Sequence, residues 1–324
     1  MVGRNRISVA ISLLILGITA VVLYHLLRGI ELAKVLAAIA AQPRPRILIA
    51  AALVFAGYFN LIFYDLFALR TIGKRKVPFR VAAFASFTSY TIGHSLGAAT
   101  LTCALVRFRV YSSWSLSVAD VAKIAFLTGM TYWLGNIFVL GGAVVYSPDT
   151  LSAVDRLPSS FNRGIAAAGL CVVICYLIWL TPRQRILGWS NWRIVLPSPR
   201  WTLLQIGIGT LDRCLAALSF YMLLPDRPAV GFMTVLIIFV VATLVGTISH
   251  APGSLGVVEA AMLVGLPQFQ REELLATLLI FRVLDFFLPL FLATVLFGSR
   301  ELRLLMRRRH AGAVPRLVRG TPPR

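Results

Sequence analysis

The sequence predicts an all-α polytopic membrane protein, and three observations support this prediction. Of the 324 residues, 58% are hydrophobic and only 14% are charged, and the mean hydropathy is +0.83. The hydrophobic residues form uninterrupted runs that are long enough to cross a bilayer. The basic residues, which give a formal net charge of +20, fall mostly between these runs. A chain with so little polar surface cannot form a water-soluble globule.

Six uninterrupted apolar runs are predicted to be full transmembrane helices, because a helix needs about 20 apolar residues to cross the hydrocarbon core. The first run follows Arg4 and Arg6 as a signal peptide would, but it exceeds the length of a signal peptide's apolar core. We therefore interpret it as an uncleaved span. The six runs are residues 7–27, 47–69, 121–145, 164–180, 201–224 and 274–297.

Two further regions, residues 79–106 and 230–266, are apolar but interrupted. Non-helical backbone at membrane depth is tolerated only where protein buries it or where it lines a wet cavity. Both regions are therefore predicted to be broken or re-entrant helical hairpins, although residues 230–248 are long enough to span alone. The alternative is that both regions cross fully, which gives eight spans. The interrupting residues are Gly93, His94 and Gly97 in the first region and His250, Pro252, Gly253 and Gly256 in the second.

The two interruptions resemble each other in sequence. The stretch from Thr91 to Gly97 matches the stretch from Thr247 to Gly256 with a short insertion. Matched interruptions in two halves of a chain are typical of internally repeated transporter folds. Two repeat units, at about residues 47–145 and 201–297, are therefore predicted. An odd number of crossings between their starts places them upside down relative to each other.

The basic residues indicate the orientation, because cytoplasmic loops carry an excess of Lys and Arg. If both broken regions return to the side they enter, most Lys and Arg lie on the side that holds the two termini. We therefore expect a multi-pass protein of a bacterial inner (plasma) membrane with both termini cytoplasmic. Residues 1–298 form the predicted transmembrane domain. Residues 299–324 are Arg-rich and contain Pro315, Pro322 and Pro323, so they are predicted to be a basic, disordered cytoplasmic tail.

Ionisable residues inside the apolar regions are the main functional candidates. Each costs about 2.5–3.5 kcal/mol at a helix centre unless it pairs or faces water. Asp65 lies near the end of its run and is expected to reach toward the loop at Arg70. Asp212 and Arg213 are adjacent and point in different directions, so each is expected to need a partner on another helix. The residues predicted to form a polar cavity or carry protons are Glu259, Asp285, Asp212, Arg213, His94 and His250.

Glu259 and Arg282 are expected to share one polar cavity in the second unit. Glu259 follows the second interruption at the start of a half-helix, where unpaired N–H groups favour a carboxylate. The alternative to this structural role is a functional one, in which Glu259 is a counter-charge or a proton carrier. Pairing with Arg282, directly or through Asp285, would lower the cost of both charges. Arg282 and Asp285 are three residues apart and can also pair with each other.

Basic residues after the first interruption form a candidate site for a lipid headgroup. Arg107, Arg109 and Tyr111 precede Ser115 and Ser117, either of which can cap the next helix. Guanidinium groups bind phosphate oxygens bidentately, and a helix N-terminus adds N–H donors. Both arginines are alternatively topological anchors. The complete set predicted to bind a headgroup is Arg107, Arg109, Tyr111, Lys123 and Arg282.

The sequence offers no catalytic residues, cofactor site or metal site. Residues 93–97 match the G-x-S-x-G elbow of α/β-hydrolases, but they lie between apolar runs instead of between a strand and a helix. The four cysteines lie in apolar stretches without the spacing of a zinc site. The basic residues do not gather on a folded polar face, so nucleic acid is not an expected partner.

Four stretches resemble the membrane domain of the bacterial lysylphosphatidylglycerol synthase and flippase family, also called the multiple peptide resistance factor family. They are SYTIG (89–93), VRFRVYSSWSLS (106–117), SHAPGSLGVVEA (249–260) and FRVLDFFLP (281–289). The resemblance extends from about residue 47 to 297. The chain differs at residues 103–105, where the family usually has paired glycines, and at Asp285 and Phe286, where the family tends to have tyrosines.

This resemblance implies a protein that binds and translocates a phospholipid or an aminoacylated phospholipid between leaflets. The family's aminoacyl-transferase domain has no counterpart in the sequence, so synthase activity is not implied. One alternative is the membrane subunit of an aminoacyl-phospholipid transferase whose catalytic domain is a separate chain. Another is an ion-coupled transporter of a small solute. The expected partner is an anionic or aminoacylated phospholipid, with a second copy of the chain or a separate transferase subunit as further candidates.

Overall fold

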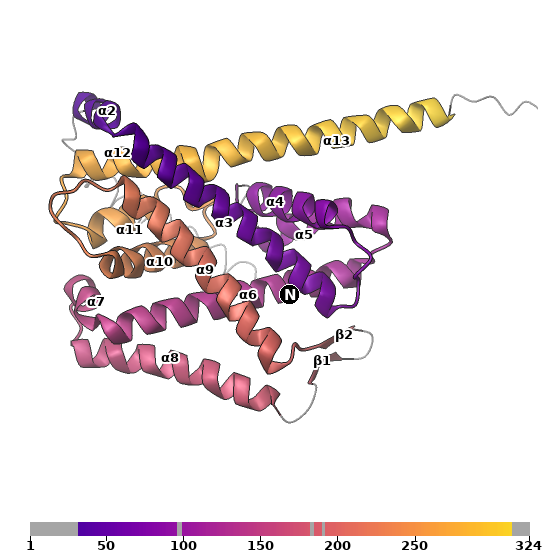
Figure 1. Cartoon of the computed structure of the whole chain (residues 1–324), viewed down its shortest axis with the longest axis horizontal. Coiled ribbons are helices and arrows are strands. Elements are labelled where there is room, and N and C mark those ends of the chain that lie inside the picture. The colour runs from indigo at the N-terminus through magenta and orange to yellow at the C-terminus, as the bar shows by residue number, and fades with distance from the viewer. Residues whose placement is uncertain (1–31, 96–98, 182–184, 190–191, 313–324) are drawn as a thin grey trace, which may run out of the picture.

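Long helices make up most of the computed structural model, which describes residues 32–95, 99–181, 185–189 and 192–312 (Figure 1). The prediction of an all-α polytopic membrane protein is confirmed, because six of the described helical segments are long and apolar enough to cross a membrane. They are α3 (Arg44–Thr71), α6 (Val118–Tyr146), α8 (Ser159–Leu180), α9 (Pro199–Leu223), α10 (Phe232–Ser249) and the continuous run Arg271–Leu304.

Five of the six predicted spans correspond to these segments, and the remaining one, residues 7–27, lies outside the described residues. The additional candidate is α10, which occupies part of the second broken region. Its 18 residues cover about 27 Å at 1.5 Å per residue, nearly the thickness of the hydrocarbon core. The second broken region therefore contains one helix of spanning length, whereas the first consists of two shorter helices.

Each broken region folds into a pair of packed helices. The first forms α4 (Phe79–Ser95) and α5 (Ala99–Tyr111), and the second forms α10, the short 3₁₀ helix η2 (Pro252–Ser254) and α11 (Val257–Gly265). In Figure 1 the first pair lies on the right and the second on the left. Helix α4 also contacts η2. The two pairs therefore meet through α4 and η2, and the inverted relation of the two repeat units stays a prediction.

Glycines act differently in the two broken regions. Gly93 lies inside α4, where an added Cβ would come within 2.9 Å of the backbone nitrogen of Cys103, so it permits close packing of α4 against α5 and does not interrupt a helix. Gly97 lies outside the described residues. In the second region α10 ends at His250, whose φ of 53° is left-handed, and Pro252 opens η2. Gly253 and Gly256 have φ values of 60° and 79°, which glycine adopts without strain.

Helices α3 and α9 pack against each other along their length and cross the middle of the molecule (Figure 1). The Asn60 side chain of α3 donates a hydrogen bond to the carbonyl of Ile208 in α9, with an N–O distance of 2.9 Å. The main core lies beside α9, where the rings of Phe220, Phe239 and Phe281 meet one another at centroid distances of 5.6–5.8 Å. The outer surface is apolar, as expected for contact with lipid; exposed side chains include Phe55, Ile178 and Phe291.

The remaining elements complete the described chain. The helices are α2 (Leu32–Ala41), η1 (Ser112–Trp114), α7 (Pro148–Asp155), α12 (Arg271–Arg282), the π-helix η3 (Val283–Phe287) and α13 (Leu288–Gly312). Strands β1 (Ile186–Trp189) and β2 (Trp192–Val195) form an antiparallel pair that the sequence analysis did not predict.

The predicted boundary of the disordered tail needs correction. Helix α13 does not end near residue 298 but continues to Gly312, and residues 313–324 lie outside the described residues. Leu, Met and Arg predominate between residues 299 and 309, and these residues favour helix, whereas the first proline of the tail is Pro315. Glu301 also anchors this part of α13 through an ion pair to Arg109 of α5.

A close approach of α6 and α9 yields a first prediction. A Cβ on Gly209 would lie 2.3 Å from the carbonyl oxygen of Thr131, whereas a Cβ on Gly207 would meet no atom within 4 Å. Because overpacking costs about 1–3 kcal/mol, Gly209→Ala should lower the thermal unfolding temperature in detergent. Gly207→Ala, on the same helix, is the matched control and should leave that temperature nearly unchanged. Equal effects of the two substitutions would contradict the close packing.

Candidate functional site

Polar side chains from both halves of the chain enclose a cavity between the two helix pairs, which we call the central cavity. Its volume is about 140 Å³. The walls come from α3, α4, α6, α9, α10, η2, α11, α12 and η3. The polar side chains that line it are Tyr58, Tyr90, Thr91, His94, Tyr132, Asp212, Arg213, Thr243, Thr247, Ser254, Arg282 and Asp285.

A second cavity of about 170 Å³, the α5-side cavity, adjoins the central cavity. It extends to Cys103 and Arg107 of α5. The residues that line both cavities are Leu61, Tyr90, His94, Tyr132, Asp212 and Thr247. The shared wall means that polar groups continue from the first helix pair to the second through the interior of an otherwise apolar protein.

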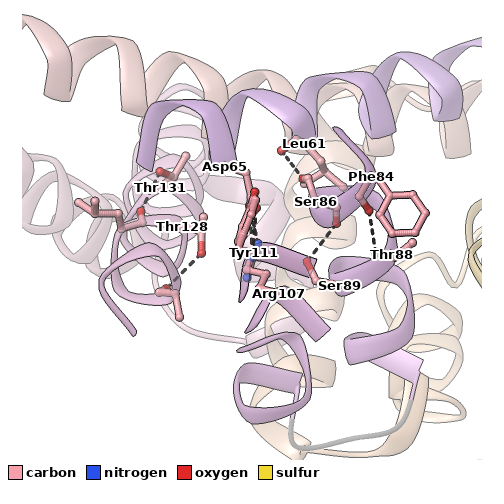
Figure 2. A network of polar contacts seen from close by, with 12 residues as sticks. Leu61, Asp65, Phe84, Ser86, Thr88, Ser89, Arg107, Tyr111, Thr128 and Thr131 are labelled. Atoms are coloured by element: carbon pink, nitrogen blue, oxygen red, sulfur yellow. Dashed lines mark hydrogen bonds and ion pairs between the residues drawn. The ribbon is translucent and has the colours of Figure 1, made fainter. Parts of the chain in front are cut away.

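Asp65 and Arg107 form a buried ion pair beside the α5-side cavity (Figure 2). The Arg107 Nη2 and Nε atoms lie 2.8 and 3.1 Å from Asp65 Oδ1, and the Tyr111 hydroxyl donates to Oδ2 at 2.7 Å. Asp65 is 0% exposed. The expectation that it reaches toward the loop at Arg70 was wrong, because α5 brings a buried guanidinium to it instead. Arg107 and Tyr111 therefore satisfy a carboxylate of α3.

Asp212 and Arg213 of α9 pair with each other in the shared part of the site. Arg213 donates through Nε to Asp212 Oδ2 at 3.0 Å, and its Nη2 contacts the same oxygen. Tyr64 donates to this oxygen at 3.3 Å, and the Arg213 guanidinium lies 5.2 Å from the ring centroid of Tyr132. The expectation that the two side chains point in different directions was wrong, because the long arginine side chain folds back onto its neighbour. The expected partners on other helices are present: Tyr64 of α3 contacts Asp212, and Tyr132 of α6 contacts Arg213.

The expected contact between Glu259 and Arg282 is present. Arg282 Nε lies 2.6 Å from Glu259 Oε1. Nη1 and Nη2 of Arg282 donate to the carbonyls of Gly253 and Ser254 at 2.8 and 3.2 Å. Glu259 also accepts a hydrogen bond from the backbone N–H of Gly256 at 2.8 Å. Arg282 lines the central cavity and Glu259 supports it from behind, so Arg282 uses Glu259 as its ion-pair partner and not Asp285.

Asp285 differs from these residues because its carboxylate has no ion-pair or hydrogen-bond partner within the described chain. It lies in the π-helix η3 and lines the central cavity. Its backbone carbonyl accepts a hydrogen bond from the Tyr58 hydroxyl at 2.8 Å. Isolated π-helical turns often mark functional positions.

The two histidines do not occupy equivalent places. His94 lies within α4, lines both cavities and stacks on Tyr90 with a centroid distance of 4.2 Å. Its Nδ1 atom is buried and has no hydrogen-bond partner among the residues that the structure describes. His250 is exposed at the end of α10 and lines neither cavity. Sequence alignment of the two interruptions therefore misled the assignment of His250 to the site.

The predicted headgroup set is not brought together. Arg109 is 46% exposed and pairs with Glu301 of α13 at 2.5 Å, away from the cavities. Lys123 is half-buried in the second turn of α6 and pairs with no residue that the structure describes. Helical periodicity explains the separation of Arg107 from Arg109, because residues two apart project from different faces of a helix. The predicted cap at Ser117 is present, since its side chain accepts from the backbone N–H of Asp120 at 3.1 Å.

Tyrosines are the main site residues that the sequence analysis missed. Tyr58, Tyr64, Tyr90 and Tyr132 lie around the cavities. Their signal was their position inside apolar runs, because a buried tyrosine hydroxyl usually needs a polar partner. Within the described ranges, no group of three or more His, Cys, Asp or Glu residues could hold a metal ion.

Comparisons with known proteins show similarity along most of the chain. No model of a known protein family matches. The uncharacterized protein slr0712 of Synechocystis is 30% identical over 270 residues, which cover 83% of this chain and 84% of that protein. The inner membrane protein YbhN of Escherichia coli is 28% identical over 258 residues, which cover 78% of this chain and 79% of that protein.

The buried pair at Asp65 yields a second prediction. Asp65→Asn leaves the buried Arg107 charge uncompensated and should lower the free energy of unfolding by about 3–5 kcal/mol. The control is Glu301→Gln, which breaks the partly exposed ion pair of Arg109, a residue on the same helix as Arg107. This change should lower the free energy of unfolding by at most about 1 kcal/mol. Denaturation in mixed micelles measures both. A loss for Asp65→Asn no larger than that for the control would show that Arg107 finds another partner.

The contact between Glu259 and Arg282 yields a third prediction, for a double-mutant cycle of Glu259→Gln and Arg282→Gln. Each single change leaves a partly buried charge unpaired, so the double variant should lose less stability than the sum of the single losses, with a coupling of about 1–3 kcal/mol. Arg282→Gln should be the more damaging single change, because it also removes the bonds to η2. The exposed pair Arg46–Asp226 serves as the control cycle and should show weaker coupling. Strictly additive losses would be incompatible with a direct interaction.

Proposed function

From the premise that this chain belongs to the same family as slr0712 of Synechocystis, we propose that it is an inner membrane protein that binds a phospholipid or an aminoacylated phospholipid and translocates it between leaflets. The relative YbhN of Escherichia coli is an inner membrane protein, and this supports the location. The excess of Lys and Arg in the segments at one end supports an orientation with both termini in the cytoplasm.

One observation carries the proposal: two adjoining polar cavities lie inside a protein whose outer surface is apolar. Moving a lipid between leaflets requires a polar path for the headgroup, while the acyl chains remain in hydrocarbon. The central cavity is lined by residues of both helix pairs, which Figure 1 shows on different sides of the molecule. Buried charged groups at membrane depth are typical of substrate pathways.

The charges of the cavity walls favour a headgroup that carries both signs. Arg107, Arg213 and Arg282 are each already paired with a carboxylate, so the walls present dipolar groups and not free positive charge. A purely anionic headgroup would gain little from such walls. A headgroup with a phosphate and an ammonium could interact with both members of a pair.

The resemblance to the lysylphosphatidylglycerol flippase domain supports the same proposal. The four stretches that carry it contribute Tyr90, Arg107, Glu259 and Arg282, which line the cavities or support their walls. Transport of a small solute is a second candidate, favoured by the modest size of the central cavity, about 140 Å³. A lipid would place only its headgroup there, whereas a small solute would enter entirely.

A reconstitution experiment yields the fourth prediction. In proteoliposomes that contain tail-labelled fluorescent phospholipids, a membrane-impermeant reductant should bleach more label than in protein-free vesicles, because lipids from the inner leaflet reach it. Arg213→Lys keeps the charge but loses the planar fork. It should slow lipid movement about tenfold, since a hydrogen bond to a charged group contributes about 1.5–3 kcal/mol.

Arg163→Lys is the matched control, because Arg163 is exposed on α8 and lines neither cavity. It should leave the rate of lipid movement unchanged. Bleaching equal to that of protein-free vesicles would refute lipid translocation. Uptake of a soluble amine or phosphate ester by the same vesicles would then favour the small-solute candidate.

A further inference from the structure

The charges around the central cavity leave one carboxylate without a counter-charge. Four aspartate and arginine side chains line this cavity within the described chain: Asp212, Arg213, Arg282 and Asp285. Arg213 is paired with Asp212, and Arg282 is paired with Glu259 behind the wall. Asp285 therefore remains as the unpaired acid.

The neighbouring arginines have few donors left for Asp285. All three kinds of nitrogen of Arg282 are engaged: Nε with Glu259, and Nη1 and Nη2 with the carbonyls of η2. Arg213 directs Nε and Nη2 to Asp212. An ionised Asp285 would thus be an uncompensated negative charge at membrane depth, which is unfavourable. Binding a proton removes that charge without any rearrangement of the two ion pairs.

The other polar groups that face the cavity are tyrosine, histidine, threonine and serine side chains, which carry no formal charge in their neutral forms. They include Tyr58 of α3, Tyr90 and His94 of α4, and Tyr132 of α6. Tyr58 directs its hydroxyl to the backbone carbonyl of Asp285, so this donor is also engaged. The groups packed around Asp285 therefore leave its carboxylate facing the open cavity.

The backbone at Asp285 is a second, independent observation. The helix is π-helical over Val283–Phe287, between the regular helices α12 and α13. Such irregular turns occur frequently at functional sites. Here the irregular turn brings the Asp285 carbonyl to Tyr58 of α3 and places its side chain on the cavity wall.

We propose that Asp285 is a proton-binding site in the central cavity and that exchange of its proton is coupled to ligand movement. In the empty cavity the side chain is a neutral carboxylic acid. It releases its proton to water in the cavity when a positively charged group enters, so that the charge of the cavity is conserved. The coupling to ligand movement rests on the proposed function; the proton site does not.

Infrared spectroscopy of the purified full chain tests the site without any ligand. At neutral pH the protein should show the carbonyl stretch of a protonated carboxylic acid, and this band should disappear in Asp285→Asn. Asp285→Glu should retain a band at a shifted frequency, which keeps the test decisive if Asp285→Asn does not fold. Asp120→Asn, which alters an acid paired with Lys74 at the start of α6, is the control and should keep the band. An unchanged band in both folded Asp285 variants, or no band in the original protein, would overturn the proposal.

Proteoliposomes with an imposed pH gradient test the coupling. The rate of lipid movement should change several-fold when the gradient is imposed, and it should become insensitive to the gradient in Asp285→Asn. If the infrared band is present but the gradient has no effect on movement, the coupling is refuted and only the proton site survives. If the band is present but no lipid moves, the proposed function fails while the proton site stands. If lipid moves but the band is absent, the proton site fails and the proposed function stands.

Discussion

The guanidinium of Arg282 satisfies two requirements that the membrane imposes on the second half of the protein. Backbone groups freed by an interrupted helix need partners where no water is available, and Arg282 donates to the freed carbonyls of Gly253 and Ser254. A charge at that depth needs a counter-charge, and Glu259 supplies it. The left-handed turn that separates α10 from α11, and hence the wall of the central cavity, depends on this one side chain.

The first half uses a different solution to the same constraint. Among the described residues, Arg107 makes no contact with the backbone of the interruption; it pairs with Asp65, which Tyr111 also contacts (Figure 2). This triad ties α5 to α3, whereas Arg282 ties α12 to η2 and α11. The two halves thus share an outline of paired helices and a buried arginine, but the arginines have different partners. The two halves are therefore similar in the arrangement of their helices, but residues at matching positions have different roles.

Pairing of every arginine on the cavity walls shapes what the cavity can accept. Preformed pairs with Asp65, Asp212 and Glu259 keep the walls close to neutral, and this lowers the cost of a polar interior inside an apolar protein. A ligand then meets oriented dipoles and one unpaired acid, Asp285. Such an interior suits a group that carries charge of both signs, and it gives Asp285 a chemical role that none of the paired residues can share.

The sequence by itself determined the features that depend on local composition. Apolar length predicted the spans that became α3, α6, α8, α9 and the run from α12 to α13, and the cap at Ser117 follows from its neighbours in sequence. The contact of Glu259 with Arg282 was also predictable, because a short turn folds α11 back beside α12. Only the tertiary structure decided which charges pair across the bundle. Asp65 and Arg107 meet because α4 and α6 pack against both α3 and α5 and bring Arg107 within reach of Asp65. Arg109 projects from another face toward α13, and His250 is exposed while His94 lines the cavities. A buried charge needs a counter-charge, and the packing of the helices decides which residue supplies it.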